Sequence, residues 1–140
     1  MIRKMRAADL DAVAAIWLDV NRSAHRFIPA RYWEDNLEQV KGMLPEAEVY
    51  VYEDGDEIQG FVGLDGDYIA GIFVRAGVQS RGIGRELLET VKAFRGRLTL
   101  NVYQKNERAI SFYRRAGFSV RQEQTDESTG EREYSMEWEK

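Results

Sequence analysis

A glycine-containing loop, Gln79 to Gly84, separates two segments of different pattern and limits what this chain can fold into. The apolar run Tyr68 to Val74 before it is typical of a strand, and the amphipathic run Arg85 to Phe94 after it is typical of a helix. The first turn of such a helix has N–H groups without intrahelical partners, and the helix dipole favours an anion there. Because Gly82 and Gly84 lack Cβ, the backbone can approach a ligand closely. The pattern predicts a phosphate-binding turn between a strand and a helix.

The length and composition bound the class of protein. With 140 residues, 44% hydrophobic and 31% charged, the chain is expected to form one globular domain over residues 1–140. No apolar run approaches the roughly 20 residues of a membrane span, and the N-terminus lacks the apolar core of a signal peptide. The absence of cysteine excludes disulfides, thiolate metal sites and cysteine nucleophiles. We therefore expect a cytoplasmic protein without a membrane partner and without a bound metal.

The net charge of −4 hides an uneven distribution. Residues 75–115, around the glycine loop, contain ten Lys or Arg and three Glu, whereas the remainder contains ten basic and twenty-one acidic residues. A polyanionic ligand requires such a concentration of positive charge, although scattered surface Arg and Lys are also common in proteins that bind no anion. The acidic remainder argues against general binding of nucleic acid and suits a cationic second partner.

Strand and helix patterns alternate along the chain. Strands are expected at residues 1–6, 49–52, 58–64, 68–74, 98–103, 118–122 and 134–138, and helices at 9–23, 29–44, 85–94 and 106–116. Trp33, Leu44, Ile83, Leu87, Leu88, Val91 and Phe94 are expected on the buried faces of the helices. Gly71, in the middle of a strand, predicts a bulge or a close backbone approach. The order β-αα-βββ-α-β-α-ββ predicts a mixed α/β fold.

Two common phosphate-binding motifs do not fit the loop. A dinucleotide-binding fingerprint would have an acidic residue about 20 residues after the glycines, but no Asp or Glu lies between Glu89 and Glu107. A nucleoside-triphosphate loop would have Lys and then Ser or Thr after its last glycine, whereas this chain has Arg85 and Glu86. The phosphates must therefore belong to another class of ligand.

Three segments together resemble the GNAT N-acetyltransferase superfamily. They are the Gln79-x-x-Gly82-x-Gly84 loop with its apolar helix, the strand Leu98 to Tyr103, and the run Asn106 to Tyr113 followed by Ala116-Gly117-Phe118. The order of elements agrees from end to end, so the resemblance covers essentially the whole chain. It implies a mixed, mostly antiparallel central sheet flanked by about four helices. More narrowly, Phe27-Ile28 with Tyr32-Trp33, and Val102 to Asn106, resemble small bacterial protein-lysine acetyltransferases.

The resemblance implies that acetyl-coenzyme A is the ligand of the loop. Its pyrophosphate would lie on the loop amides, with Arg81 and Arg85 adding positive charge, and its pantetheine arm would pair with the backbone of Ile72 to Val74. Asn106 would contact the same arm while capping its helix, although capping alone is an equal alternative. The implied cofactor-binding residues are Ile72, Phe73, Val74, Gln79, Ser80, Arg81, Gly82, Ile83, Gly84, Arg85 and Asn106.

Tyr113 is the candidate catalytic residue that the resemblance implies, because the family places the second aromatic of Phe112-Tyr113 near the sulfur of the cofactor. When an amine attacks the thioester in a ternary complex, a thiolate is expelled. A thiol with a pKa near ~8.5 leaves better if a proton is offered to it, so Tyr113 would be a general acid. The alternative is that Tyr113 packs in the core or at an interface.

The general base and the acceptor pocket are less defined. Many family members use a carboxylate on the strand before the loop, but Tyr68 to Val74 contains none. A water chain ordered by Tyr68, Tyr103 and Asn101 is the first candidate for the base. His25, the single histidine, is the second, because its ordinary pKa suits proton transfer and its segment flanks the acceptor site in this fold. Phe27, Trp33 and Tyr68 are candidates for the wall of the acceptor pocket, and each is as compatible with core packing.

Two classes of function remain open on the sequence. The first is an N-acetyltransferase that moves the acetyl group of acetyl-coenzyme A to a primary amine: a protein lysine, an N-terminus or a small amine, with a cationic acceptor favoured. The second is a non-catalytic module that senses coenzyme A and binds a protein partner. The missing strand carboxylate favours the second class, whereas Tyr113 favours the first.

Overall fold

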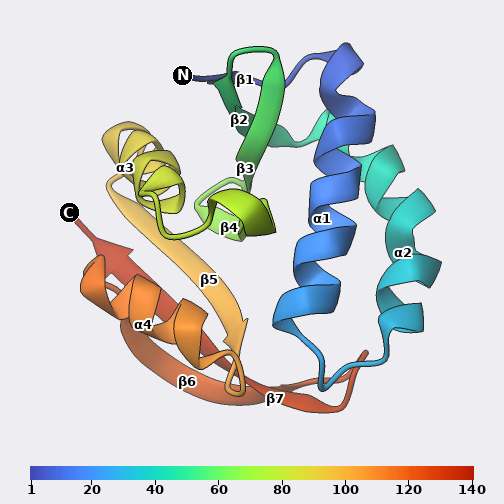
Figure 1. Cartoon of the computed structure of the whole chain (residues 1–140). Helices are drawn as coiled ribbons and strands as arrows, with labels where there is room; N and C mark the ends of the chain where they lie inside the picture. The colour runs from blue at the N-terminus through green and yellow to red at the C-terminus, as the bar shows by residue number, and fades with distance from the viewer.

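Seven strands form one sheet in the computed structural model, which describes all 140 residues (Figure 1). The strands are β1 (Ile2–Lys4), β2 (Glu48–Asp54), β3 (Glu57–Asp65), β4 (Tyr68–Val74), β5 (Arg97–Tyr103), β6 (Ser119–Asp126) and β7 (Glu131–Glu139). The helices are α1 (Leu10–Ala24), α2 (Ala30–Met43), α3 (Ile83–Phe94) and α4 (Glu107–Arg115). The sheet order is β1-β2-β3-β4-β5-β7-β6, and every neighbouring pair is antiparallel except β4 with β5. The mixed, mostly antiparallel fold expected from the sequence is confirmed.

The helices form two layers around the sheet. Alternating side chains on β2 show how: Val49 and Val51 pack toward α1, whereas Tyr50 packs toward α3. The core beneath α3 and α4 is the larger of the two and includes Tyr113. Figure 1 shows α1 and α2 side by side on one side of the molecule and α3 and α4 on the other. None of the helices combines the length and the hydropathy that crossing a bilayer requires.

Local sequence signals place the ends of the helices that border the site. Pro29 directly precedes α2, and Pro45 lies in the 3-10 turn that ends it, as expected. Asn106 caps α4, because its Oδ1 accepts a hydrogen bond from the N–H of Ala109 at 3.2 Å. Gly82 precedes α3 with a φ of 87°, a left-handed conformation that glycine adopts without steric cost. The starts of α3 and α4 border the site described below.

The expected burial of Phe94 was wrong, because its side chain is 52% exposed. Phe94 is the last residue of α3, and the chain leaves the helix immediately after it. Its ring contacts that of Tyr50, with centroids 5.5 Å apart, and is open to solvent on its other side. The helical spacing of apolar residues places Phe94 on the buried face of α3, but it does not show whether the sheet still covers that face at the end of the helix.

β4 and β5 diverge soon after they meet, and this divergence positions the site. Their parallel pairing is limited to Tyr68 with Thr99 and Ile69 with Leu100. A register shift against β3 leaves Ala70 without a partner next to Gly71, which confirms the expected bulge. Beyond the bulge, the edge of β4 that faces β5 has no neighbouring strand. The sheet therefore opens along that edge.

Gly60 keeps β3 close to the open part of β4, and its replacement tests this packing. A Cβ at position 60 would lie 2.7 Å from the carbonyl oxygen of Phe73, whereas a Cβ at Gly63 would meet only the Cβ of Ala70, at 4.0 Å. We expect Gly60→Ala to lower the free energy of unfolding by about 1–3 kcal/mol. The matched control, Gly63→Ala on the same strand, should change it by less than about 1 kcal/mol. Urea unfolding of both variants is the measurement, and equal losses would contradict the assigned contact.

Candidate active site

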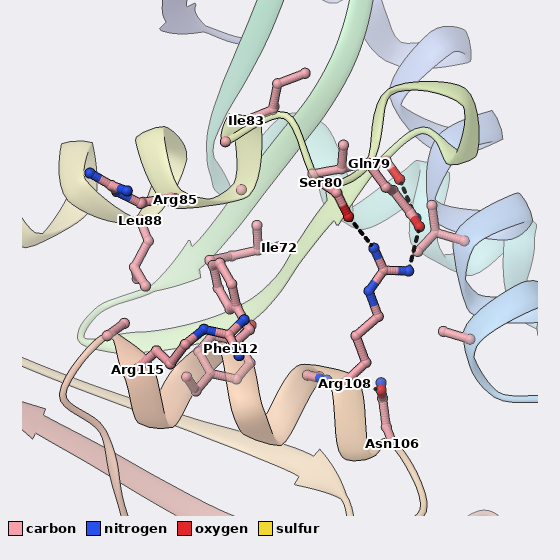
Figure 2. A pocket seen from close by; sticks show the side chains of 18 of the residues that line it. Ile72, Gln79, Ser80, Ile83, Arg85, Leu88, Asn106, Arg108, Phe112 and Arg115 are labelled. Atoms are coloured by element: carbon pink, nitrogen blue, oxygen red, sulfur yellow. Dashed lines mark hydrogen bonds between the residues drawn. The ribbon is translucent and has the colours of Figure 1, made fainter.

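A cleft of about 910 Å³ lies where β4 and β5 diverge (Figure 2). Its walls come from the end of β4, the glycine loop, the first turns of α3, most of α4 and the C-terminal end of α1. The cofactor-binding residues expected from the sequence that line it are Ile72, Val74, Gln79, Ser80, Gly82, Ile83, Gly84, Arg85 and Asn106. The strand, loop and two helix starts singled out in the sequence thus meet in one cavity.

Two expected cofactor-binding residues, Phe73 and Arg81, do not line the cleft. The Phe73 side chain points to the opposite face of the sheet and stacks on Phe61, with ring centroids 4.9 Å apart. This follows from the alternation of side chains along a strand. Only the main chain of Phe73 is on the open edge of β4. Arg81 is exposed outside the lining of the cleft, so its expected phosphate contact is not supported.

Arg108 reaches from α4 to the glycine loop and closes the near side of the cleft (Figure 2). Its Nη1 donates to Oε1 of Gln79 at 3.0 Å, and its Nη2 donates to Oγ of Ser80 at 2.9 Å. Gln79 in turn donates from Nε2 to the carbonyl oxygen of Val74 at 2.9 Å, and Ser80 has a left-handed φ of 66°. Sequence patterns do not identify Arg108 as a site residue, because a contact across 28 residues leaves no local signal. Its place two residues after the helix cap was the one available clue.

Positive charge in the cleft is available for an anion. Arg85, Arg108 and Arg115 line the cavity and form no ion pair with a carboxylate, whereas Lys105 pairs with Glu131 at 3.1 Å. An unpaired guanidinium is a strong donor to phosphate oxygens because its N–H groups lie in a fixed plane. The first turn of α3 contributes N–H groups and the positive end of its dipole. The cavity is therefore suited to a polyphosphate ligand.

Tyr113 lies at the inner end of the cleft and is 7% exposed. Its ring packs edge to face against Phe112 and Phe118. Its hydroxyl makes no hydrogen bond within the protein, and the only buried polar side-chain atom without a partner is Nε1 of Trp33, so this hydroxyl is not sealed in the core. Burial raises the pKa of Tyr113 well above its ordinary value, and nearby Tyr68 adds to the shift. Tyr113 is therefore a protonated donor at the bottom of the cleft.

His25 is not placed to be the general base. Its Nε2 lies 3.1 Å from Nδ2 of Asn106 and its Nδ1 lies 3.1 Å from Oδ1 of Asn21, so both ring nitrogens are engaged. Desolvation lowers the pKa of His25 to about 4, which makes its free form a poor proton acceptor at neutral pH. The expectation of a catalytic base at this position is corrected. Asn21 precedes His25 by one helical turn, whereas Asn106 becomes its neighbour only in the fold.

Tyr68, Asn101 and Tyr103 share the sheet face opposite α4. Tyr68 is 37% exposed, and desolvation followed by the charges of Glu133 and Asp126 raises its pKa, while Asn101 acts in the other direction. The Tyr103 hydroxyl donates to Oδ2 of Asp126 at 2.6 Å. The expected water-ordering groups are therefore brought together, next to two carboxylates from β6 and β7. Sequence patterns do not single out these two acids, because they lie far along the chain in a hairpin that contains many charged residues.

The three residues expected in the wall of the acceptor pocket differ in how they lie. Phe27 contacts Tyr103, with ring centroids 5.7 Å apart, and the ammonium group of Lys105 lies over its ring. Trp33 is 7% exposed and packs under His25 against Trp17. It supports this region from behind and offers no open surface, so its assignment to the wall is corrected. Phe27 and Tyr68 keep surfaces on the side of the sheet that carries Asn101.

Comparison with known proteins agrees with this geometry. The family model for the acetyltransferase (GNAT) domain matches residues 45–120. The peptidyl-lysine N-acetyltransferase YiaC of Escherichia coli K12 is 37% identical over 122 residues, which cover 86% of this chain and 84% of YiaC. The peptidyl-lysine N-acetyltransferase YjaB of the same organism is 33% identical and covers 85% of this chain and 82% of its own.

Solved structures show the same fold. The apo form of YjaB from Escherichia coli superposes with a TM-score of 0.87 at 29% identity, covering 99% of this chain and 96% of that one. The PaiA N-acetyltransferase of Thermoplasma acidophilum, solved with coenzyme A, superposes with a TM-score of 0.83, covering 100% of this chain and 98% of that one. At 20% identity, the second comparison supports the fold alone.

The fold and the matching family model together define a coenzyme A-dependent acyltransferase. The chain belongs to the GNAT acetyltransferase family. It is an N-acetyltransferase, and acetyl-coenzyme A is its acetyl donor. The non-catalytic alternative left open by the sequence is thereby set aside.

Proposed function

We propose that residues 1–140 act as one domain that acetylates lysine side chains of proteins. The observation that carries the proposal is the position of Tyr113 and Tyr68: the first lines the cofactor cleft, the second lies on the opposite sheet face, and Tyr68 is close enough to contribute to the raised pKa of Tyr113. A thioester held in the cleft would thus be reached by an amine arriving from the Tyr68 side. The names of the two curated relatives, both peptidyl-lysine N-acetyltransferases, support this choice of acceptor.

The charge of the acceptor side favours a cationic partner. Tyr103 pairs in register with Glu133 of β7, which pairs with Gln124 of β6, so their side chains share the sheet face of Tyr68. Asp126 and Glu131 follow on the same face at the end of the hairpin. Figure 1 shows this hairpin running beneath the connection between α1 and α2. A lysine ammonium approaching here meets carboxylates, whereas the phosphates of the donor meet arginines on the other side.

The proposed reaction is direct attack in a ternary complex. The lysine ammonium first loses a proton to water ordered by Tyr68, Asn101 and Tyr103, because an amine with a pKa near ~10.4 is mostly charged at neutral pH. The C–N bond then forms as the C–S bond breaks, and the thiolate receives the proton of Tyr113. The proton that the new amide nitrogen loses returns through the same water to the tyrosine. The raised pKa of Tyr113 keeps it protonated, and its hydroxyl stabilises the thiolate charge as a hydrogen-bond donor before the proton moves.

The proposal also includes the setting of the reaction. Both curated relatives come from Escherichia coli, which supports the bacterial setting expected from the sequence, and the proposed compartment is the cytoplasm. In that setting the acceptor would be a folded protein with an exposed lysine, rather than nucleic acid or a membrane component.

An acceptor screen tests the substrate class. The enzyme and acetyl-coenzyme A are incubated with N-terminally blocked lysine peptides, with lysine-free peptides that have a free N-terminus, and with spermidine, and free thiol is measured. We expect release with the blocked lysine peptides, with the acetyl group located on Nζ by mass spectrometry. Acidic residues flanking the lysine should lower kcat/KM, because they meet the carboxylates of the β6–β7 hairpin. Turnover confined to the lysine-free peptides or to spermidine would overturn the lysine assignment.

A further inference from the structure

An unbroken chain of hydrogen bonds runs from α4 to α1 across one end of the cleft. The N–H of Ala109 donates to Oδ1 of Asn106 at 3.2 Å, and Nδ2 of Asn106 lies 3.1 Å from Nε2 of His25. Nδ1 of His25 lies 3.1 Å from Oδ1 of Asn21, and Nδ2 of Asn21 donates to the carbonyl oxygen of Trp17 at 2.9 Å. Its central link joins residues 81 positions apart.

The two ends of the chain fix the direction of every bond in it. The N–H of Ala109 can only donate, so the Asn106 atom that it meets is the oxygen, and the Asn106 amide nitrogen faces His25. The carbonyl of Trp17 can only accept, so the nitrogen of Asn21 faces it and the oxygen of Asn21 faces His25. His25 must therefore accept at Nε2 and donate from Nδ1. It is neutral, with one defined tautomer.

This tautomer determines what Asn106 presents to the cleft. The oxygen of Asn106 is used by the helix cap, and one of its two N–H bonds points at His25. The other N–H is the remaining hydrogen-bonding group of a side chain that lines the cavity. Rotation of the amide by 180° would lose the cap and place two acceptors against each other. His25 thus holds Asn106 as a donor toward the ligand.

We propose that His25 is a positioning residue for acetyl-coenzyme A, which acts through Asn106 by fixing its amide as a donor in the cleft. The hydrogen-bond chain also connects two sides of the molecule. His25 ends α1 and begins the segment that includes Phe27, so the same bonds tie the acceptor side of the molecule to the cofactor side. The inference deepens the function proposed above. It is tested by cofactor binding without any acceptor, so its failure is distinguishable from failure of the lysine assignment.

Two substitutions of His25 separate positioning from packing. Glutamine places its amide oxygen near the position of Nε2 and can accept from Asn106, whereas asparagine is shorter and reaches only toward Asn21. We expect His25→Asn to raise the Kd for coenzyme A about fivefold to tenfold, and His25→Gln to change it by less than about twofold. Isothermal titration calorimetry measures both, and thermal unfolding checks that the two variants are folded to the same extent. Equal weakening by both variants would overturn the proposal.

A double-mutant cycle tests whether His25 acts through Asn106. Asn106→Ser keeps a side-chain oxygen for the helix cap and removes the amide donor. In the Asn106→Ser background, His25→Asn should change the Kd for coenzyme A by less than about twofold, because the group that it positions is already absent. A further fivefold loss in that background would show that His25 acts by another route.

The wild-type protein offers a readout that needs no variant. Imidazole ¹⁵N NMR at pH 7 reports which nitrogen of His25, the only histidine, carries the proton. We expect a protonated Nδ1 and an unprotonated Nε2, unchanged by the addition of coenzyme A. A proton on Nε2, or a charged ring, would reverse the direction of the hydrogen-bond chain and overturn the proposal even if a variant fails to fold.

Discussion

Tyr113→Phe is expected to lower kcat by about 100- to 1000-fold while leaving the Kd for coenzyme A unchanged. The substitution removes a hydroxyl that makes no hydrogen bond within the protein and keeps the ring that packs against Phe112 and Phe118. The fold and the cofactor cleft should therefore persist, and the loss should fall on the departure of the thiolate. Steady-state thiol release with saturating acceptor measures kcat, and calorimetry measures the Kd.

Tyr134→Phe is the matched control, because it removes a hydroxyl from β7 outside the cleft. Its kcat should stay within about twofold of the wild type. A leaving group that needs less protonation gives a second test: a thioester of an acidic thiol should lose less rate in Tyr113→Phe than acetyl-coenzyme A does. Unchanged kcat in Tyr113→Phe would remove the proposed general acid and leave Tyr113 as a packing residue.

The second large effect concerns stability at acidic pH. In the unfolded chain His25 titrates near ~6.5, whereas in the folded protein its pKa is about 4, because burial disfavours the charged ring. Its two hydrogen-bond partners are amides, and no carboxylate contacts the ring to hold an imidazolium. Between these two pKa values the unfolded chain binds a proton that the folded protein does not. The free energy of unfolding should therefore be highest above about pH 6.5 and fall as the pH decreases toward 4.

His25→Gln isolates this effect, since glutamine stays neutral at every pH. Between pH 7 and pH 4, the free energy of unfolding of the wild type should fall by about 2–3 kcal/mol more than that of His25→Gln. This range is smaller than the full linkage value because the ring of His25 is partly open to solvent. The carboxylates of Asp9, Glu48, Glu53 and Glu137 have lowered pKa values and also destabilise the fold on acidification, but they do so in both proteins. Urea unfolding at several pH values is the measurement. Parallel pH profiles would contradict the assigned pKa.

Much of the fold is readable from the sequence because its signals are local. The period of apolar residues separates strands from helices, and Pro29, Pro45, Asn106 and Gly117 mark helix ends through backbone chemistry that needs no tertiary context. No local sequence pattern predicts the parallel contact of β4 with β5. The resemblance to a known family implied a mixed sheet without naming the parallel pair, which the structure shows as two residue pairs.

The candidate site likewise contains some residues that the sequence predicts and others that it does not. The glycine loop and Tyr113 belong to segments whose spacing is characteristic, so the sequence finds them. The contacts of Arg108 with the loop and of His25 with Asn106 join residues 28 to 81 positions apart, and no local pattern records them. The role of Trp33 could not be predicted either. An aromatic side chain near a site has the same sequence pattern whether it lines the pocket or supports the pocket from behind.

The short contact between β4 and β5 has a mechanical consequence. Strand pairing between one half of the sheet, β1 to β4, and the other half, β5 to β7, is limited to two residue pairs, and the remaining contact between the halves is the shared core beneath α3 and α4. A ligand that lies along the open edge of β4 and contacts α4 bridges both halves, so it stiffens the molecule as well as occupying a site. We therefore expect a protease to digest the enzyme faster without its acetyl donor than with the donor bound. The supply of the donor would set how long the enzyme lasts in addition to how fast it works.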